Sequence, residues 1–307
     1  METNAKCFTT SQDFFKRTND NKYKYKVDIS DDLQTIKCNK RIYILSSLLG
    51  QGSYGKIYFF KTIDGLEDNV VLKIEYTKKI NVPTEKKISE VLEEESCGTV
   101  LLRYIKSINQ TSNHFYVMNK MSGDLTGLIN NVVLPNKNNG GIQGFLLLIE
   151  DIRSQISCLA KKGYYYTDLK PGNVLYCNED NGSITVSLGD LGSVHSTHRY
   201  QIATFPPPEY SDSKGYFMVK EIKHREILSW VLGCLTASIV ISHIHILGWN
   251  NGKKINQNVT EIVEQLEIQY KKYMTPKQID LIKRMLSINP NERPNIHQPF
   301  YEFIEAI

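Results

Sequence analysis

The sequence predicts an α+β fold of two lobes, a small antiparallel β-sheet lobe with one helix and a larger, mainly α-helical lobe. Two apolar runs with the alternation of strands, residues 42–49 and 57–60, are separated by a short polar interval. Farther along, residues 142–162 carry apolar side chains at helical spacing, and Gly163 follows as a C-terminal cap. We therefore expect a polar N-terminal extension over residues 1–40, the strand-rich lobe over 41–118 and the helical lobe over 119–307.

The composition fits a soluble globular protein with room for two lobes. The chain has 307 residues, of which 41% are apolar and 23% are charged, and its net charge is +4. Its six cysteines are scattered without a Cys-x-x-Cys pair, which argues against a zinc knuckle and against a disulfide framework. Residues 1–6 are polar and lack the apolar core of a secretory signal. We expect an intracellular, cytoplasmic protein in a reducing compartment. The bias toward Asn, Ile and Lys is typical of an AT-rich genome, such as that of a large DNA virus or a parasite, and a viral protein would lie in the host cytoplasm.

Two segments raise the question of other partners. Residues 16–26 are basic and carry two tyrosines, a composition that can contact nucleic acid but is more often simply solvated. Residues 227–249 contain no Asp, Glu, Lys or Arg and are long enough to cross a bilayer, yet they include several Ser, Thr and His residues. A buried core helix is the better interpretation. We therefore expect protein partners and no membrane, with nucleic acid as the weaker alternative, and the oligomeric state stays open.

Three glycines, Gly50, Gly52 and Gly55, lie between the two apolar runs. Glycines let the backbone approach an anion without Cβ clashes, so that amide N–H groups can point at phosphate oxygens. The same spacing occurs at the start of a helix in dinucleotide-binding folds, but here residues 57–60 continue as a strand. The pattern therefore predicts a hairpin that covers phosphates.

A lysine, Lys73, lies inside the β-branched run 69–74. An ammonium group in such a strand is costly unless an anion and a carboxylate meet it, which predicts a phosphate-binding role. The alternative is an edge-strand lysine that points to water. The predicted helix over residues 84–92 offers the carboxylate, and Glu85, one turn before its apolar stripe, is preferred. The rivals are Glu90, Glu93 and Glu94.

Four polar residues follow in an order that suits phosphoryl transfer: Asp168, Lys170, Asn173 and, after a short interval, Asp190. This chemistry needs an aimed hydroxyl and neutralised phosphate charge rather than covalent help from the protein. Asp168 would aim the hydroxyl and Lys170 would steady the terminal phosphate. Asn173 and Asp190 would hold Mg²⁺. The alternative is a polar surface turn that contains the same residue types by chance.

From about Arg41 to the C-terminus these motifs resemble the eukaryotic-type protein kinase family, and in detail its casein-kinase-one and vaccinia-related-kinase branch. In that branch the phosphate lysine and the helix glutamate are closely spaced, as Lys73 and Glu85 are. The resemblance implies a bilobal protein-kinase-like fold with ATP and Mg²⁺ as cofactors, and it implies a hinge over residues 115–125 with Met118 as gatekeeper. By that match the hinge contacts to adenine come from Asn119 and Met121, and the ring is sandwiched by Leu49, Ile57, Val71 and Leu175.

Two later segments, residues 205–210 and 280–294, resemble the Ala-Pro-Glu segment and the late arginine-bearing helix and loop of the same family. The resemblance implies a buried ion pair between Glu209 and Arg293, which fixes one arrangement of the fold more than it adds stability. Sugar and antibiotic kinases share these motifs less, so the expected acceptor is a protein. A small-molecule kinase of the same fold is the disfavoured alternative.

The sequence also departs from the family close to the catalytic aspartate. Tyr166 and Thr167 replace the usual His-Arg, so gating by a phosphorylated activation loop is not expected. Leu191 replaces Phe, which conserves apolar volume. Leu228 stands where an aspartate normally braces the His-Arg backbone, and Glu226 is a candidate for that support. Two hypotheses follow: an ATP-dependent serine/threonine protein kinase, or a nucleotide-binding pseudokinase that acts as a scaffold or regulator.

Overall fold

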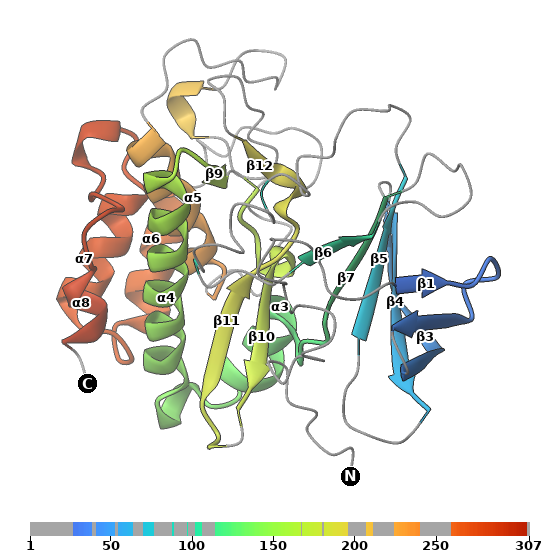
Figure 1. The fold of residues 1–307 in the computed structure, drawn as a ribbon. Coiled ribbons are helices and arrows are strands. Elements are labelled where there is room, and N and C mark those ends of the chain that lie inside the picture. The colour runs from blue at the N-terminus through green and yellow to red at the C-terminus, as the bar shows by residue number, and fades with distance from the viewer. Residues whose placement is uncertain are drawn as a thin grey trace. The chain divides into compact units, whose positions relative to one another are not determined.

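The computed structural model has the predicted α+β architecture, an antiparallel sheet lobe and a helical lobe (Figure 1). By its contacts the chain divides into two compact units, the first of residues 1–96, 100–122 and 177–185 and the second of residues 97–99, 123–176 and 186–307. The structure describes residues 27–38, 41–52, 55–63, 70–76, 88, 97, 102–105, 114–166, 168–179, 181–195, 207–210, 224–239 and 259–305.

The first unit is built on a seven-stranded sheet with the strand order β1-β2-β3-β4-β5-β7-β6, in which all neighbours are antiparallel. Its strands are β1 (Val27–Ile29), β2 (Thr35–Cys38), β3 (Arg41–Gly52), β4 (Gly55–Thr62), β5 (Val70–Glu75), β6 (Leu102–Ile105) and β7 (His114–Asn119). The hairpin that the glycine pattern predicted is confirmed as β3 and β4. Two register shifts interrupt the pairing of these strands and bend the hairpin.

The strands β1 and β2 lie inside the segment that the sequence analysis assigned to a polar extension. β2 alternates half-buried or exposed with buried side chains, and Ile36 and Cys38 are fully buried. Together with Ile29 and Tyr43 they share one hydrophobic core with apolar side chains of β4, β5 and β7. The strand signal in the sequence is weak because only two positions of β2 are apolar. Pairing with β3 and burial against the sheet stabilise the hairpin instead.

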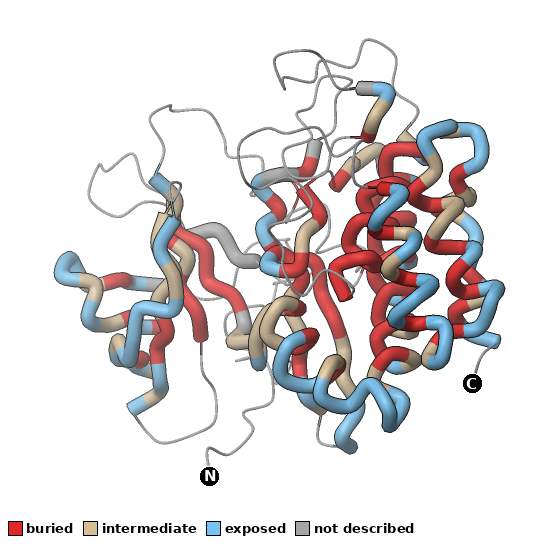
Figure 2. Tube along the Cα trace, turned by 180° about the vertical axis from the view of Figure 1, so that it is seen from behind, coloured by how far each residue is buried: buried red, intermediate tan, exposed pale blue. Residues whose placement is uncertain are grey.

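The second unit is mainly helical and contains α4 (Gly141–Lys161) and α5 (His224–Ala237). α4 confirms the predicted helix, because Ile149, Ile152 and Ile156 are fully buried. Most of the helix is buried, and its exposed residues are Gly144, Asp151, Ser154 and Lys161; Figure 2 colours the chain by burial. Gly163 ends the helix with φ 79°, and its N–H donates to the carbonyl of Ala160 at 3.0 Å, as a helix C-cap requires. The remaining helical segments are α3 (Leu125–Leu128), η1 (Ile129–Val133), η2 (Lys137–Asn139), α6 (Val259–Tyr270), α7 (Pro276–Met285), η8 (Pro290–Glu292) and α8 (Tyr301–Ile304).

The helix α5 is buried from Glu226 to Ala237. It contains the first part of the uncharged segment 227–249, so the core-helix interpretation is confirmed as far as residue 237. Residues 240–249 lie outside the described ranges. Within those ranges no helix combines the length and the apolar character that a membrane span needs.

A disulfide joins Cys97 to Cys158 of α4, which are 61 positions apart in the sequence and 5.6 Å apart between Cα atoms. The expectation that the cysteines form no disulfide is therefore wrong. No local spacing signals this pair, because only the fold brings the two thiols together. In the chain-entropy account, a cross-link that closes a loop of this length contributes about 4 kcal/mol to stability.

The ion pair between Glu209 and Arg293 is confirmed, but only its arginine is buried, because Glu209 is exposed. The guanidinium donates to both carboxylate oxygens of Glu209, at 2.6 and 2.7 Å, and its Nε donates to the carbonyl of Ser287 at 2.9 Å. It also stacks over the indole of Trp230 in α5, 4.9 Å from the ring centroid. Arg293 is buried and Glu209 lies in η5 (Pro208–Tyr210), so the pair ties that segment to the helical core.

We expect Arg293→Met to lower the free energy of unfolding by ~3–5 kcal/mol. The substitution removes the ion pair with Glu209, the hydrogen bonds to the carbonyls of Ser287 and Glu226, and the stack on Trp230. The matched control is Arg284→Met. Arg284 pairs with Asp280 and Glu302, but its side chain is 39% exposed, so we expect a loss below ~1 kcal/mol. Urea unfolding measures both changes, and equal losses in the two variants would contradict the assignment.

A histidine of the C-terminal segment contacts α4. The Nδ1 atom of His297 lies 3.1 Å from the hydroxyl oxygen of Ser157. Burial, followed by the positive charges of Lys161, Arg225 and Arg153, lowers the pKa of His297 below its ordinary value of 6.5. As the pH falls through 6.5, the unfolded chain therefore binds a proton at this position before the folded chain does. The free energy of unfolding decreases in that window.

We expect His297→Gln to reduce this acid sensitivity. The loss of unfolding free energy between about pH 7.5 and about pH 5.5 should be smaller in the variant than in the wild-type protein, since glutamine does not titrate. Urea titrations at several pH values give the difference. A wild-type and a variant profile that run parallel would show that His297 has an ordinary pKa in the folded state.

Candidate active site

The catalytic loop lies between β9 (Tyr165–Tyr166) and β10 (Val174–Asn178), and its last part is η3 (Pro171–Asn173). Within it the side chains of Lys170 and Asn173 converge on one carboxylate oxygen of Asp168. The Nζ of Lys170 donates to Oδ2 at 2.8 Å, and the Nδ2 of Asn173 donates to the same oxygen at 3.1 Å and to the Asp168 carbonyl at 2.9 Å. Asp168 and Asn173 are buried, so the aspartate is held in one orientation. The structure thus brings these three predicted residues together.

The fourth predicted residue, Asp190, follows β11 (Ile184–Leu188) at the start of η4 (Leu191–Ser193). It adopts the left-handed conformation with φ 47° and ψ 61°, which aspartate tolerates better than most residues. The conformation costs a non-glycine residue ~1–3 kcal/mol, and residues held in it cluster at functional sites. The residue before it, Gly189, donates its N–H to the carbonyl of Asn173 at 2.8 Å. The turn that carries Asp190 is therefore bonded to the catalytic loop. Leu191 is buried, as expected for an apolar residue in place of Phe.

The residues fit a magnesium ion. Carboxylate and amide oxygens are the hard ligands that Mg²⁺ prefers, and a protein usually supplies only one or two of them while water and substrate phosphates complete the shell. The amide nitrogen of Asn173 is engaged with Asp168, so its amide oxygen is the atom that would face the ion. Among the residues that the structure describes, no cluster of three or more His, Cys, Asp or Glu side chains offers a different metal site.

The departures at Tyr166 and Leu228 leave the site supported by other contacts. Tyr166 is fully buried, and its hydroxyl donates to the carbonyl of Gly189 at 2.5 Å, a bond that the sequence analysis did not foresee. Its neighbour Tyr165 stacks on His224 at the start of α5, with ring centroids 3.6 Å apart and planes 6° apart. Leu228 is buried as an apolar core residue, and Thr167 lies outside the described ranges.

The suggestion that Glu226 replaces the missing aspartate stays a prediction, because Thr167, part of the segment it would brace, lies outside the described ranges. Its carboxylate accepts from Arg225 at 2.9 Å, and its carbonyl accepts from Arg293 at 3.3 Å. Both contacts lie at α5 and the late loop rather than at the catalytic loop. The stack of Tyr165 on His224 gives the catalytic loop a support of another kind, because it joins α5 to β9, the strand that precedes Asp168.

The glycine hairpin belongs to the first unit. β3 and β4 stay paired to the end of the hairpin, where Gly52 lies opposite Gly55. A Cβ atom at Gly55 would lie 2.0 Å from the carbonyl oxygen of Ile74, so only glycine fits there. At Gly50 and Gly52 a Cβ would meet no atom within 4 Å, which leaves the backbone on that side open to a ligand. Ser53 and Tyr54 at the tip lie outside the described ranges.

Lys73 lies on β5, a central strand between β4 and β7, with Ile57 and Tyr116 as its cross-strand neighbours. The edge-strand alternative is therefore wrong, and the side chain is half-buried. Glu85 and its rivals Glu90, Glu93 and Glu94 lie outside the described ranges. The roles of Lys73 and of Glu85 toward ATP stay predictions.

The residues predicted to surround adenine fall into both units. In the first unit Val71 lies opposite Met118 on neighbouring strands, and both are buried. Ile57 is half-buried and Leu49 is exposed. The backbone of Asn119 ends β7, and Met121 follows in a half-buried position. Leu175 belongs to the second unit, where it pairs with Asp124 of β8 (Gly123–Asp124). Their roles toward the adenine ring stay predictions.

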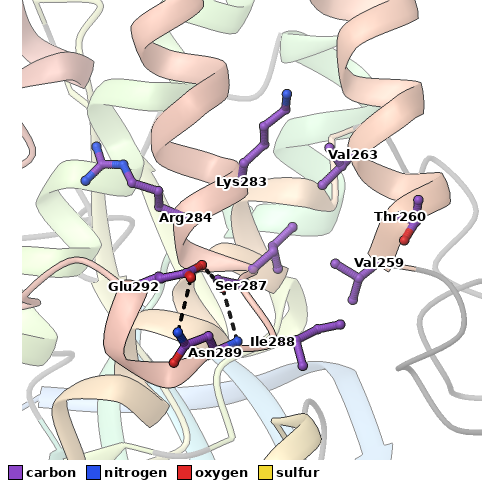
Figure 3. A pocket seen from close by; sticks show the side chains of 10 residues that line it. Val259, Thr260, Val263, Lys283, Arg284, Ser287, Ile288, Asn289 and Glu292 are labelled. Atoms are coloured by element: carbon purple, nitrogen blue, oxygen red, sulfur yellow. Dashed lines mark hydrogen bonds between the residues drawn. The ribbon is translucent and has the colours of Figure 1, made fainter.

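A separate groove of about 710 Å³ lies between α6, the end of α7 and η8 (Figure 3). None of its lining residues belongs to the catalytic loop or to the Asp190 turn. Its charged side chains are engaged with neighbours. Lys283 pairs with Glu267, Arg284 pairs with Asp280 and Glu302, and Glu292 accepts from Ser287 and Asn289. The groove is not the site of the predicted chemistry.

Comparison with known proteins gives the family. The family model described as protein kinase domain matches residues 43–302. The chain is 24% identical over 312 residues to the CTD kinase subunit alpha of Schizosaccharomyces pombe, an alignment that covers 88% of this chain and 49% of that protein. It is 24% identical over 259 residues to the human serine/threonine-protein kinase DCLK3, covering 78% of this chain and 35% of that protein.

A putative ribosomal protein S6 kinase alpha-1 of Caenorhabditis elegans is 20% identical over 266 residues, which cover 84% of this chain and 32% of that protein. The chain thus spans half or less of the length of these curated relatives. The family model, however, covers the sheet lobe from β3 onward, the catalytic loop, the Asp190 turn and the late arginine loop. On that match and on the geometry of Asp168, Lys170 and Asn173, the chain belongs to the protein kinase family.

Proposed function

We propose that the chain is an ATP-dependent protein kinase that transfers the γ-phosphate of Mg·ATP to serine or threonine hydroxyls of protein substrates. The observation that carries this proposal is the Asp168 carboxylate, buried and held through Oδ2 by both Lys170 and Asn173. These two hydrogen bonds orient the Asp168 carboxylate before any substrate binds. Phosphoryl transfer depends mainly on the protein holding the reacting groups in the right orientation.

In the proposed reaction Asp168 aligns the acceptor hydroxyl and takes its proton. Lys170 contacts Asp168 at 2.8 Å, and its side chain is partly exposed, so it can turn its ammonium toward the transferred phosphoryl group. Asn173 and Asp190 present their oxygens to Mg²⁺, which supplies positive charge to the phosphates when bound. Lys73 with Glu85, and the backbone of the glycine hairpin, position ATP.

Serine/threonine specificity and a protein acceptor are supported by two observations. DCLK3, which matches most of this chain, carries serine/threonine-protein kinase in its name. The Glu209–Arg293 pair holds the segment that resembles the Ala-Pro-Glu motif of protein kinases. Membership of the casein-kinase-one and vaccinia-related-kinase branch stays a prediction.

The alternative is a pseudokinase, which the sequence suggested through Tyr166, Thr167 and Leu228. The contacts of the structure favour the active enzyme instead. Tyr166 bonds the Asp190 turn and Tyr165 packs on α5, so the catalytic loop retains support on both sides. Asp168, assigned to hydroxyl alignment, and Asn173 and Asp190, assigned to metal binding, are of the residue types that phosphoryl transfer requires.

We expect Asp168→Asn to lower kcat by ~10²- to 10⁴-fold, because an amide aligns the hydroxyl but does not take its proton. Asp280→Asn on the exposed face of α7 is the matched control and should leave kcat unchanged. The measurement is transfer of radiolabelled γ-phosphate to a serine/threonine peptide library, with nucleotide binding followed by thermal shift. Equal turnover of wild-type protein and Asp168→Asn rejects the proposal. Binding of Mg·ATP by a wild-type protein that transfers no phosphate supports the pseudokinase.

A further inference from the structure

A glutamine of α4, Gln155, is hydrogen-bonded to β11, the strand that precedes the Asp190 turn. Gln155 is 8% exposed, and its side-chain amide makes two hydrogen bonds to the backbone of β11. The Nε2 atom donates to the carbonyl of Val186 at 2.8 Å, and the Oε1 atom accepts from the N–H of Leu188 at 3.1 Å. Neither the catalytic mechanism proposed above nor the sequence motifs assign this residue a role.

The match between the amide and the strand follows from backbone geometry. β11 is the edge strand of a three-stranded sheet with the order β11-β10-β8, so among the described residues no strand pairs with one row of its N–H and C=O groups. In a strand, the C=O of one residue and the N–H of the residue two positions later point to the same side. A glutamine amide offers one donor and one acceptor at that separation. Gln155 therefore takes the place of a neighbouring strand at Val186 and Leu188.

Three hydrogen bonds fix the end of β11. Leu188 is held by Gln155 of α4. The next residue, Gly189, accepts from the Tyr166 hydroxyl at 2.5 Å and donates to the carbonyl of Asn173 at 2.8 Å. Asp190 is the first residue beyond these bonds, and it adopts the left-handed conformation described above. The position of its carboxylate is thus set by where β11 ends.

We propose that Gln155 is a positioning residue for Asp190: by clamping β11 to α4 it sets the distance of the Asp190 carboxylate from Asn173 and hence the affinity of the site for Mg²⁺. This inference rests on the proposed function. A displacement of about 1 Å in a catalytic group can lower the rate by ~10²-fold. Loss of the clamp therefore acts on metal affinity and on transfer, in addition to any effect on stability.

The test compares two buried glutamines. Gln155→Met keeps the length and the apolar volume of the side chain and removes its donor and its acceptor. Gln278→Met is the matched control, because Gln278 is also buried and its amide is also hydrogen-bonded. Its Nε2 donates to Oε1 of Gln143 at 2.9 Å, and its Oε1 accepts from the Thr275 N–H at 2.8 Å and from Nε2 of Gln143 at 3.3 Å. Gln278 caps α7 and contacts neither β11 nor the Asp190 turn.

Three quantities are measured for the wild-type protein and both variants: the exchange rate of the Leu188 amide proton, the Mg²⁺ concentration at half-maximal phosphate transfer, and the melting temperature. Both variants should lose stability. We expect only Gln155→Met to accelerate exchange at Leu188 and to raise the Mg²⁺ midpoint, by ~10-fold or more. An unchanged midpoint, or an equal rise in Gln278→Met, overturns the proposal. If Gln155→Met does not fold, Gln155→Glu, which retains the acceptor for the Leu188 N–H and loses the donor, decides by the same measurements.

The two proposals fail in different ways. Absence of phosphate transfer from the wild-type protein rejects the proposed function. The exchange rate at Leu188 and the Mg²⁺ dependence of thermal stabilisation by ATP do not depend on turnover. If these two quantities stay at their wild-type values in Gln155→Met, the positioning role of Gln155 is rejected whether or not the protein transfers phosphate.

Discussion

The proposed chemistry depends on a hydrogen-bonded connection between two chain segments, the catalytic loop and the turn after β11. Asn173 stands at the centre of that connection. Its side chain donates to Asp168, and its carbonyl accepts from Gly189, the residue before Asp190. One residue thus relates the position of the proposed base, Asp168, to the position of the proposed second metal ligand, Asp190. Because all of these groups are buried or adjoin buried groups, the hydrogen bonds persist without competition from water.

Around this connection the fold supplies supports that differ in kind from those the family resemblance led us to expect. A tyrosine hydroxyl and a glutamine amide hold β11 and its turn, and an aromatic stack joins the catalytic loop to α5. Elsewhere in the second unit a charged pair connects two segments, because Arg293 binds Glu209 of η5. Neutral hydrogen bonds weaken little when the ionic strength or the pH changes. The supports of β11 and of its turn are therefore insulated from changes that would weaken ion pairs, whereas the contact between Lys170 and Asp168 is itself an ion pair.

The sequence predicted the elements whose signals are local. The period of α4, its Gly163 cap, the glycine hairpin and the spacing of Asp168, Lys170 and Asn173 each depend on residues close together in the chain, and the structure contains all of them. Features made by distant residues were missed unless the family resemblance supplied them, as it did for the Glu209–Arg293 pair. The clamp of Gln155 on β11 joins positions more than thirty residues apart, and the Cys97–Cys158 disulfide joins positions 61 apart. The strands β1 and β2 were missed because their few apolar residues become a strand signal only beside β3.

The disulfide has a consequence for the integrity of the chain. In the sequence Cys97 precedes β6 and β7 of the first unit and Cys158 lies in α4, and both cysteines belong to the second unit. Any single break of the peptide backbone between these two cysteines leaves both fragments in one covalent molecule. A nick made by a protease in that interval would escape notice on a non-reducing gel and would separate into two bands only after reduction.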